Sequence, residues 1–204
     1  IHYRYSKGKN KHVLVFLHGV GGNWTVCKKE LAYFQKKGFS TLALNLRGHG
    51  QSGCPQTFQS YSLPNFSRDI YDLLHHEKIN DFSLIGHSLG GGIIINYFMK
   101  YKKKFPTSAV LIESCSIYPF DHDRILTLSP YVVQLLRYVE KQKDLRKDHF
   151  PHFKDVDLSE ESMGTNIHLI SHLLHLTPLQ SVVRTLDNVE EFVFKNKKRI
   201  EHTL

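Results

Sequence analysis

Short apolar runs alternate with amphipathic segments over the first 115 residues. The run VLVFL at 13–17 is apolar at every position, which is typical of a strand buried on both faces of a parallel sheet. Residues 25–37 carry apolar and lysine side chains on opposite sides at helical spacing, and Gly38 ends this segment. The same alternation predicts strands at 1–5, 40–44, 82–85 and 109–112 and helices at 65–76 and 89–101. Such an order predicts parallel strands joined by right-handed crossovers.

The pattern changes after Cys115, where helical spacing continues and no further strand is predicted. Helices are expected at 126–139, 160–176 and 179–195, with prolines between them. The chain therefore divides into three expected parts. These are a β/α core over 1–115, a helical segment over 116–192 and a return towards the core over 193–204.

Composition fits one soluble globular domain, since 41% of the 204 residues are hydrophobic. The net charge of +8 raises the question of a nucleic-acid partner. The lysines gather in short runs, at 102–104 and near 195–199, and no zinc-finger, helix-turn-helix or RNA-binding signature accompanies them. We interpret these runs as solvated helix faces and expect no nucleic-acid partner.

Three cysteines, Cys27, Cys54 and Cys115, are far apart and lack C-x-x-C spacing. This pattern argues against a disulfide framework or a structural zinc site and favours reduced thiols in a cytosolic protein. No apolar run approaches the ~18 residues of a membrane-spanning helix, and no signal peptide is visible. We expect a cytoplasmic location and no integral membrane segment.

The strongest chemical signal is the G-x-S-x-G sequence at residues 86–90, centred on Ser88. A predicted strand ends immediately before it and a predicted helix begins immediately after it. A sharp strand-to-helix turn exposes a serine hydroxyl above the sheet, and glycines two residues to either side permit the crowded backbone. The helix N-terminus favours negative charge that develops there. Ser88 is therefore the expected nucleophile; the alternative is a glycine-rich turn that packs or binds phosphate.

Two other loops follow buried strands. The sequence His18-Gly19-Val20-Gly21-Gly22 can offer a backbone N–H to an oxyanion, although a simple turn explains a histidine–glycine pair equally well. The expected oxyanion donors are the N–H groups of Val20 and Leu89, the residue after the serine. In the loop at 45–52, Arg47 and His49 are expected to brace the backbone rather than to perform chemistry.

These three segments together resemble the α/β-hydrolase superfamily, in particular its esterase, lipase and C–C hydrolase-like branch. The matching motifs are H-G-x-x-G at 18–22, L-R-G-H-G-x-S at 46–52 and G-H-S-L-G-G at 86–91. The resemblance implies an α/β fold with a parallel-sheet hydrolase core, here incomplete, and a helical lid or cap. It implies acyl transfer to water from an ester-like substrate through a Ser88 acyl-enzyme, with His18, Gly19 and His87 at the substrate pocket. It implies no cofactor and no metal.

Two details depart from the family pattern. Asn45 stands where family members commonly have Asp, which we interpret as a change in loop bracing. Serine rather than aspartate at the nucleophile position argues against haloalkane dehalogenase and epoxide hydrolase chemistry.

The catalytic acid and histidine are not identifiable in the sequence. The family order is Ser, then Asp or Glu, then His, and the chain ends where the strands bearing the last two are expected. Glu113, 113−88=25 residues after the serine, is an alternative acid, although an ordinary charge at a strand end is favoured. His168, His172 and His175 share a predicted helix face, which is better read as a polar surface than as a metal site. The base remains unknown.

Two explanations account for this gap. The favoured one is an incomplete sequence, truncated before the acid and the histidine of a serine hydrolase with a small-molecule ester-like substrate. The other is a naturally short, non-catalytic α/β-hydrolase-fold protein that binds a ligand or a partner. The oligomeric state is left open.

Overall fold

The computed structural model describes residues 1–112, 114 and 177–201, and the expected helices at 126–139 and 160–176 lie outside these residues. The described strands form one sheet in the order β1-β3-β2-β4-β5. Their bounds are β1 Tyr3–Ser6, β2 Asn10–Leu17, β3 Phe39–Leu44, β4 Phe82–His87 and β5 Ser108–Ile112. The predicted strands are confirmed, and β2 to β5 pair in parallel as expected. Strand β1 is the exception and pairs antiparallel with β3, because the three residues between β1 and β2 are too few for a crossover.

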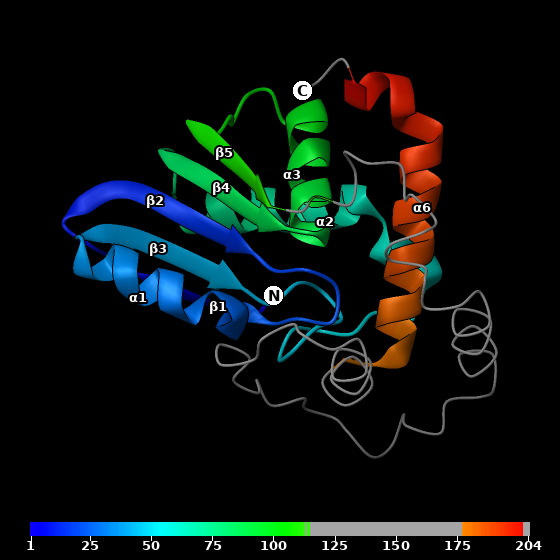
Figure 1. Ribbon diagram of the computed structural model, residues 1–204, viewed down its shortest axis with the longest axis horizontal. Helices are drawn as coiled ribbons and strands as arrows, with labels where there is room; N and C mark the ends of the chain where they lie inside the picture. Colours follow the sequence, from blue (N-terminus) through cyan, green and yellow to red (C-terminus); the bar gives the residue numbers. More distant parts are fainter. Residues whose placement is uncertain (113, 115–176, 202–204) are drawn as a thin grey trace.

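Helices cover both faces of this sheet (Figure 1). Helix α1 lies on one face, and α2 and α3 lie on the other. Their bounds are α1 Lys28–Lys36, α2 Leu63–His76 and α3 Leu89–Lys100, with short 3₁₀ turns at η1 Trp24–Cys27 and η2 Phe58–Tyr61 and a long helix α6 at Leu179–Glu201. None of the described helices is long and apolar enough to cross a bilayer.

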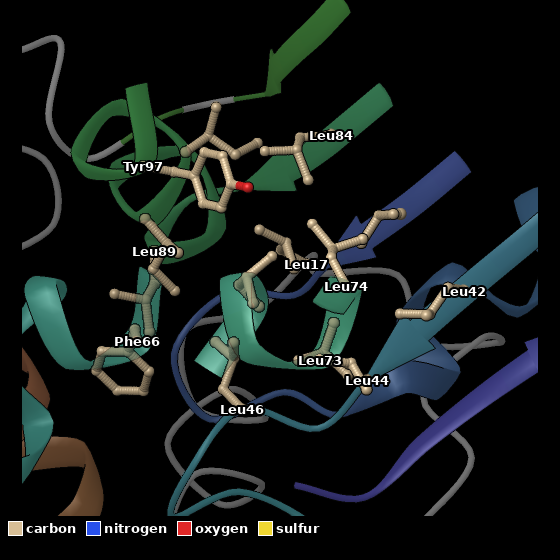
Figure 2. Close-up of a cluster of buried hydrophobic side chains, with 14 of the residues drawn as sticks. Leu17, Leu42, Leu44, Leu46, Phe66, Leu73, Leu74, Leu84, Leu89 and Tyr97 are labelled. Atoms are coloured by element: carbon tan, nitrogen blue, oxygen red, sulfur yellow. The ribbon is translucent and has the colours of Figure 1, made fainter. Parts of the chain in front are cut away.

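The alternation of side chains along β2 divides the core into two parts. Val13, Val15 and Leu17 point into the large cluster beneath α2 and α3, whereas Leu14 and Phe16 contact the smaller cluster beneath α1. Figure 2 shows the large cluster, in which leucines from the strands meet aromatic and leucine side chains from the helices. Burial of both faces explains why this run has no polar position.

A neutral histidine ties together the loops that follow β2 and β3. The Nε2 atom of His18 accepts a hydrogen bond from the Leu46 N–H at 3.0 Å, so its Nδ1 carries the proton and donates to the Gly19 carbonyl at 2.7 Å. The ring is 1% exposed and lies 5.2 Å from the ring of His49. Both nitrogens of His18 are therefore occupied within the protein, and the side chain braces the two loops.

The loop after β3 is braced as the sequence predicted. Arg47 forms a two-pronged ion pair with Asp69 at 2.7 and 2.6 Å and also donates to the Ser60 carbonyl. His49 is fully buried and bonds to the Arg47 carbonyl at 3.0 Å. Asn45 is fully buried and accepts from the Trp24 N–H at 2.9 Å, which agrees with a bracing role at this position.

Helix α6 packs on loops of the core that are far away in the sequence, and Ser181 lies 120 and 127 positions after the two residues that it contacts there. The Ser181 hydroxyl is 3.0 Å from the Tyr61 hydroxyl and 3.3 Å from the Cys54 sulfur. The expected helix at 179–195 is confirmed and continues to Glu201, so the expected division at residue 193 falls inside α6. Val189, Phe192 and Ile200 continue the apolar side of this helix against the core.

Protonation of the two buried histidines generates the first prediction. Burial, followed by repulsion from His49, lowers the pKa of His18 to about 3, and burial lowers the pKa of His49 to about 4. The unfolded chain takes up these protons near pH 6.5 and the folded protein does not, so stability must fall as the pH decreases through that value. Between pH 7 and pH 5 we expect a loss of about 2 kcal/mol in unfolding free energy for each histidine.

Urea unfolding at both pH values measures this loss. His49→Asn should remove about half of it, and the matched control His75→Asn, at an exposed position, should leave it unchanged. An imidazole resonance of His18 that titrates near pH 6.5 in the folded protein would contradict the interpretation.

Close packing at Gly48 generates the second prediction. Its φ is +75°, and an added methyl would lie 2.5 Å from the Tyr61 ring and 2.6 Å from the Ser181 hydroxyl. We expect Gly48→Ala to lower the unfolding free energy by about 2–3 kcal/mol through strain and overpacking. Gly53→Ala, where nothing lies within 4 Å, is the control and should change it by less than about 0.5 kcal/mol. Equal values for the two variants in thermal or urea unfolding would refute this account of how α6 docks.

Candidate active site

Ser88 occupies a strained turn between β4 and α3. Its φ is 50° and its ψ is −111°, and among the described residues Lys78 is the one other non-glycine with a positive φ. Such a backbone costs about 1–3 kcal/mol and persists only where the surroundings enforce it. The Ser88 N–H donates to the Ile112 carbonyl at 2.9 Å, which fixes the turn to the end of β5.

Glycines make the turn sterically possible. A methyl at Gly86 would lie 2.4 Å from the Gly90 backbone, and one at Gly90 would lie 2.4 Å from the Leu17 carbonyl oxygen. Both distances are far below van der Waals contact, so no side chain fits at either position. The absence of side chains lets the first turn of α3 cross directly over the end of β2.

The loop after β2 comes into contact with Ser88. Leu17 pairs with Gly86 in the sheet, so this loop and the serine turn leave neighbouring strands at the same edge. A methyl added at Gly19 would lie 3.2 Å from the Ser88 Cβ. The loop is closed by a hydrogen bond from the Gly22 N–H to the Gly19 carbonyl at 3.2 Å, and Gly21 takes a φ of +77°. This tight turn places Val20 at its corner.

Two backbone N–H groups in this region have no acceptor among the residues that the structure describes. Within the part of the chain that the structure describes, neither the Val20 N–H nor the Leu89 N–H donates a hydrogen bond. Leu89 is the first residue of α3, so its N–H belongs to the positive end of the helix dipole. N–H groups of this kind can donate hydrogen bonds to an oxyanion.

The predicted pocket residues differ in their surroundings. Gly19 lies against Ser88, as described above. His87 is half-buried, and its Nδ1 would lie 3.2 Å from a methyl at Gly19. His18 has no free nitrogen to offer a substrate, because both are used in bracing the loops.

The alternative acid and the histidines of the predicted helix at 160–176 lie outside the part of the chain that the structure describes. These residues are Glu113, His168, His172 and His175. Over the described ranges 1–112, 114 and 177–201, no side chain forms a hydrogen bond with the Ser88 hydroxyl. In those same ranges, no three His, Cys, Asp or Glu side chains are grouped as metal ligands.

Sequence reasoning missed the support that α6 gives to this site. Thr177, which is fully buried two residues before α6, donates to the Gly21 carbonyl at 3.1 Å across 156 positions of sequence. Ser114 is buried against Gly91, and in the described ranges its hydroxyl has no hydrogen-bond partner. No spacing rule links Thr177 to the loop at 18–22, so only the folded chain reveals this contact.

Comparisons with known proteins agree with this geometry. The family model described as alpha/beta hydrolase fold matches residues 12–152, about two thirds of the chain. The chain is 36% identical over 78 residues to Protein ABHD8 of Homo sapiens, covering 38% of this chain and 18% of that protein. It is 29% identical over 101 residues to Epoxide hydrolase 3 of Xenopus tropicalis, covering 50% of this chain and 27% of that protein. The chain thus spans well under two thirds of the length of these relatives.

Solved structures show the same fold at low sequence identity. The esterase EaEST from Exiguobacterium antarcticum superposes with a TM-score of 0.65 at 17% identity, covering 92% of this chain and 68% of that chain. A carboxylesterase of the archaeon Nitrososphaera gargenis gives a TM-score of 0.62 at 19% identity, covering 98% and 72%. The serine turn, the parallel sheet and the match of the family model lead to one conclusion: the chain belongs to the α/β-hydrolase fold family.

Proposed function

We propose that this chain carries the nucleophile and the oxyanion-binding loops of a serine hydrolase that transfers an acyl group from an ester-like substrate to water. The observation that carries the proposal is the strained turn at Ser88, in direct contact with the Gly19 loop. A serine hydroxyl needs exposure, a base and nearby donors to act as a nucleophile. The turn supports the first of these. The N–H groups of Val20 and Leu89, which donate to no acceptor within the described residues, support the third.

In the proposed reaction the Ser88 Oγ attacks the substrate carbonyl carbon and gives its proton to a histidine base. The carbonyl oxygen becomes an oxyanion that accepts hydrogen bonds from the Val20 and Leu89 N–H groups. Collapse of this intermediate breaks the bond to the leaving alcohol, which takes the proton back from the histidine. Water then attacks the acyl-enzyme by the same route and releases the acid. The base and its acid are assigned to no described residue.

Ester-like substrates are favoured over epoxides for this chain. Relatives include Epoxide hydrolase 3. The family resemblance associates epoxide opening with an aspartate at the nucleophile position, and position 88 holds a serine. A carbonyl carbon is the electrophile that suits a serine nucleophile between backbone donors.

Removal of the nucleophile tests the proposal in the protein of full natural length. Ser88→Ala should abolish covalent labelling by a fluorophosphonate and lower the hydrolysis of a p-nitrophenyl ester by about 10⁴-fold or more. The control is Ser114→Ala, which removes a neighbouring buried hydroxyl and should retain labelling. A folded full-length protein that is never labelled would favour the alternative of a ligand-binding protein without turnover.

The position of the Gly19 loop gives a second test. A methyl at Gly19 would press on Ser88 and on His87 at 3.2 Å, so the loop must shift by a few tenths of an ångström. We expect Gly19→Ala to fold, with its kcat lowered ten- to a hundred-fold through misplacement of the Val20 N–H. Gly53→Ala should keep the wild-type kcat. A Gly19→Ala enzyme with unchanged kcat and KM would remove the loop from the mechanism.

A further inference from the structure

The end of the sheet opposite Ser88 collects lysines from three separate connections. Ser88 follows the carboxyl end of β4, and a six-residue strand separates the two ends of the sheet by roughly 20 Å. The starts of the parallel strands β2 to β5 lie along the edge of the molecule that is far from α6 in Figure 1. Exposed lysines stand in the connections that lead to these starts, namely Lys7 and Lys9, Lys36 and Lys37, and Lys102 and Lys103.

Four of these lysines line one groove. Its volume is about 570 Å³, and its walls are formed by Lys7, Lys9, Lys36 and Lys37 together with Gly8, Gln35 and Gly38. All of these lining residues are among those described, and none of them is acidic. An anion that enters the groove therefore meets positive charge from both sides.

Backbone contacts hold the two lysine-bearing turns together. A methyl at Gly8 would lie 2.3 Å from the Gly38 carbonyl oxygen, so the turns touch through their main chains. The Asn10 N–H donates to that same carbonyl at 2.9 Å, and the Gly8 N–H donates to the Ser40 hydroxyl at 3.0 Å. These backbone contacts fix the positions of the two turns relative to each other, and with them the lysines that the turns carry.

Neighbouring groups do not neutralise this charge. The negative end of the α1 dipole stabilises the charges of Lys36 and Lys37 at the end of this helix. It does not act in this way on Lys7 and Lys9, which lie in a turn between strands. In the described part of the chain none of the four lysines forms an ion pair. The four lysine charges repel one another because the fold holds them close together. An anion that binds between them therefore reduces this electrostatic repulsion.

The acidic side chains at this end of the sheet already have partners. Glu77 accepts a hydrogen bond from the Tyr3 hydroxyl. Asp81 is 2.6 Å from His12 Nδ1 and accepts from the Thr107 hydroxyl at 3.0 Å. Neither carboxylate lines the groove.

Aromatic rings accompany the lysines. Tyr33, next to the groove, is 58% exposed, and the Lys37 ammonium lies 5.7 Å from its ring centre. Phe105 follows Lys102 and Lys103 and is 54% exposed. Exposed rings between lysines suit the headgroup layer of a bilayer, where the ring enters the boundary and the ammonium meets lipid phosphate.

We propose that this end of the sheet docks on an anionic lipid surface, with a lipid headgroup phosphate in the groove between Lys7, Lys9, Lys36 and Lys37. Three lysine-bearing connections and two exposed rings at one end match an extended surface better than a small soluble anion. In this orientation Ser88 faces away from the bilayer. The inference is independent of the chemistry at Ser88.

Vesicle binding tests the proposal on the intact protein. We expect it to bind vesicles of mixed phosphatidylcholine and phosphatidylserine, to ignore phosphatidylcholine alone, and to bind less tightly as salt is raised. Each lysine at a lipid surface contributes roughly five-fold to partitioning, so Lys36→Gln combined with Lys37→Gln should weaken binding by roughly 25-fold. Tyr33→Ser should weaken the binding that remains at high salt, where ring insertion dominates.

The same helix offers a charge-matched control. Lys28→Gln combined with Lys29→Gln removes the same charge from the other end of α1, ~12 Å away, and should change binding by less than about three-fold. If the Lys36 and Lys37 variant does not fold, Lys7→Gln with Lys9→Gln tests the same groove without touching a helix end.

Three results would overturn the proposal. The first is equal weakening by the groove and control variants, which would mean a general effect of net charge. The second is the absence of binding to phosphatidylserine vesicles. The third is binding of inorganic tripolyphosphate or RNA in the groove without binding of vesicles, which would assign the lysines to a soluble polyanion.

Discussion

The structure depends on one close approach of backbones, where the first turn of α3 crosses over the end of β2. Gly86 and Gly90 leave no room for a β-carbon, and the Ser88 N–H is fixed to the end of β5. Three neighbouring strands therefore converge on one turn, and its strain is held by contacts on every side. The position of the serine hydroxyl follows from this steric constraint before any chemistry is considered.

The loops around this turn are held by buried groups that stay uncharged. His18 uses both ring nitrogens to join two loops, and His49 lies beside it with a lowered pKa. Thr177 and Ser181 add hydrogen bonds from the far end of the sequence. These hydrogen bonds join the loops around Ser88 at one end of the sheet. The opposite end of the sheet bears the lysines and exposed rings of the proposed lipid-docking surface.

Much of the fold was predictable because its signals are local. A strand buried on both faces must be apolar throughout, as at 13–17, and an amphipathic helix must repeat its apolar side, as in α2. The turn at Ser88 was equally predictable from the sequence, because its steric requirement for glycine is met within five residues and a strand and a helix flank it. Parallel pairing was predicted for strands joined by helices, and it holds for β2 to β5. No helix lies between β1 and β2, and the antiparallel pairing of β1 with β3 is a feature that the sequence pattern did not supply.

The sequence by itself determined the class of fold, the sharp turn at Ser88 and the bracing roles of Arg47 and His49, because short-range spacing and steric exclusion carry that information. Only the tertiary structure decided the contact of Gly19 with Ser88, the use of both His18 nitrogens and the meeting of two lysine-bearing turns in one groove. These features join residues from separate elements. Their energies depend on distance and burial, and neither quantity exists until the chain has folded.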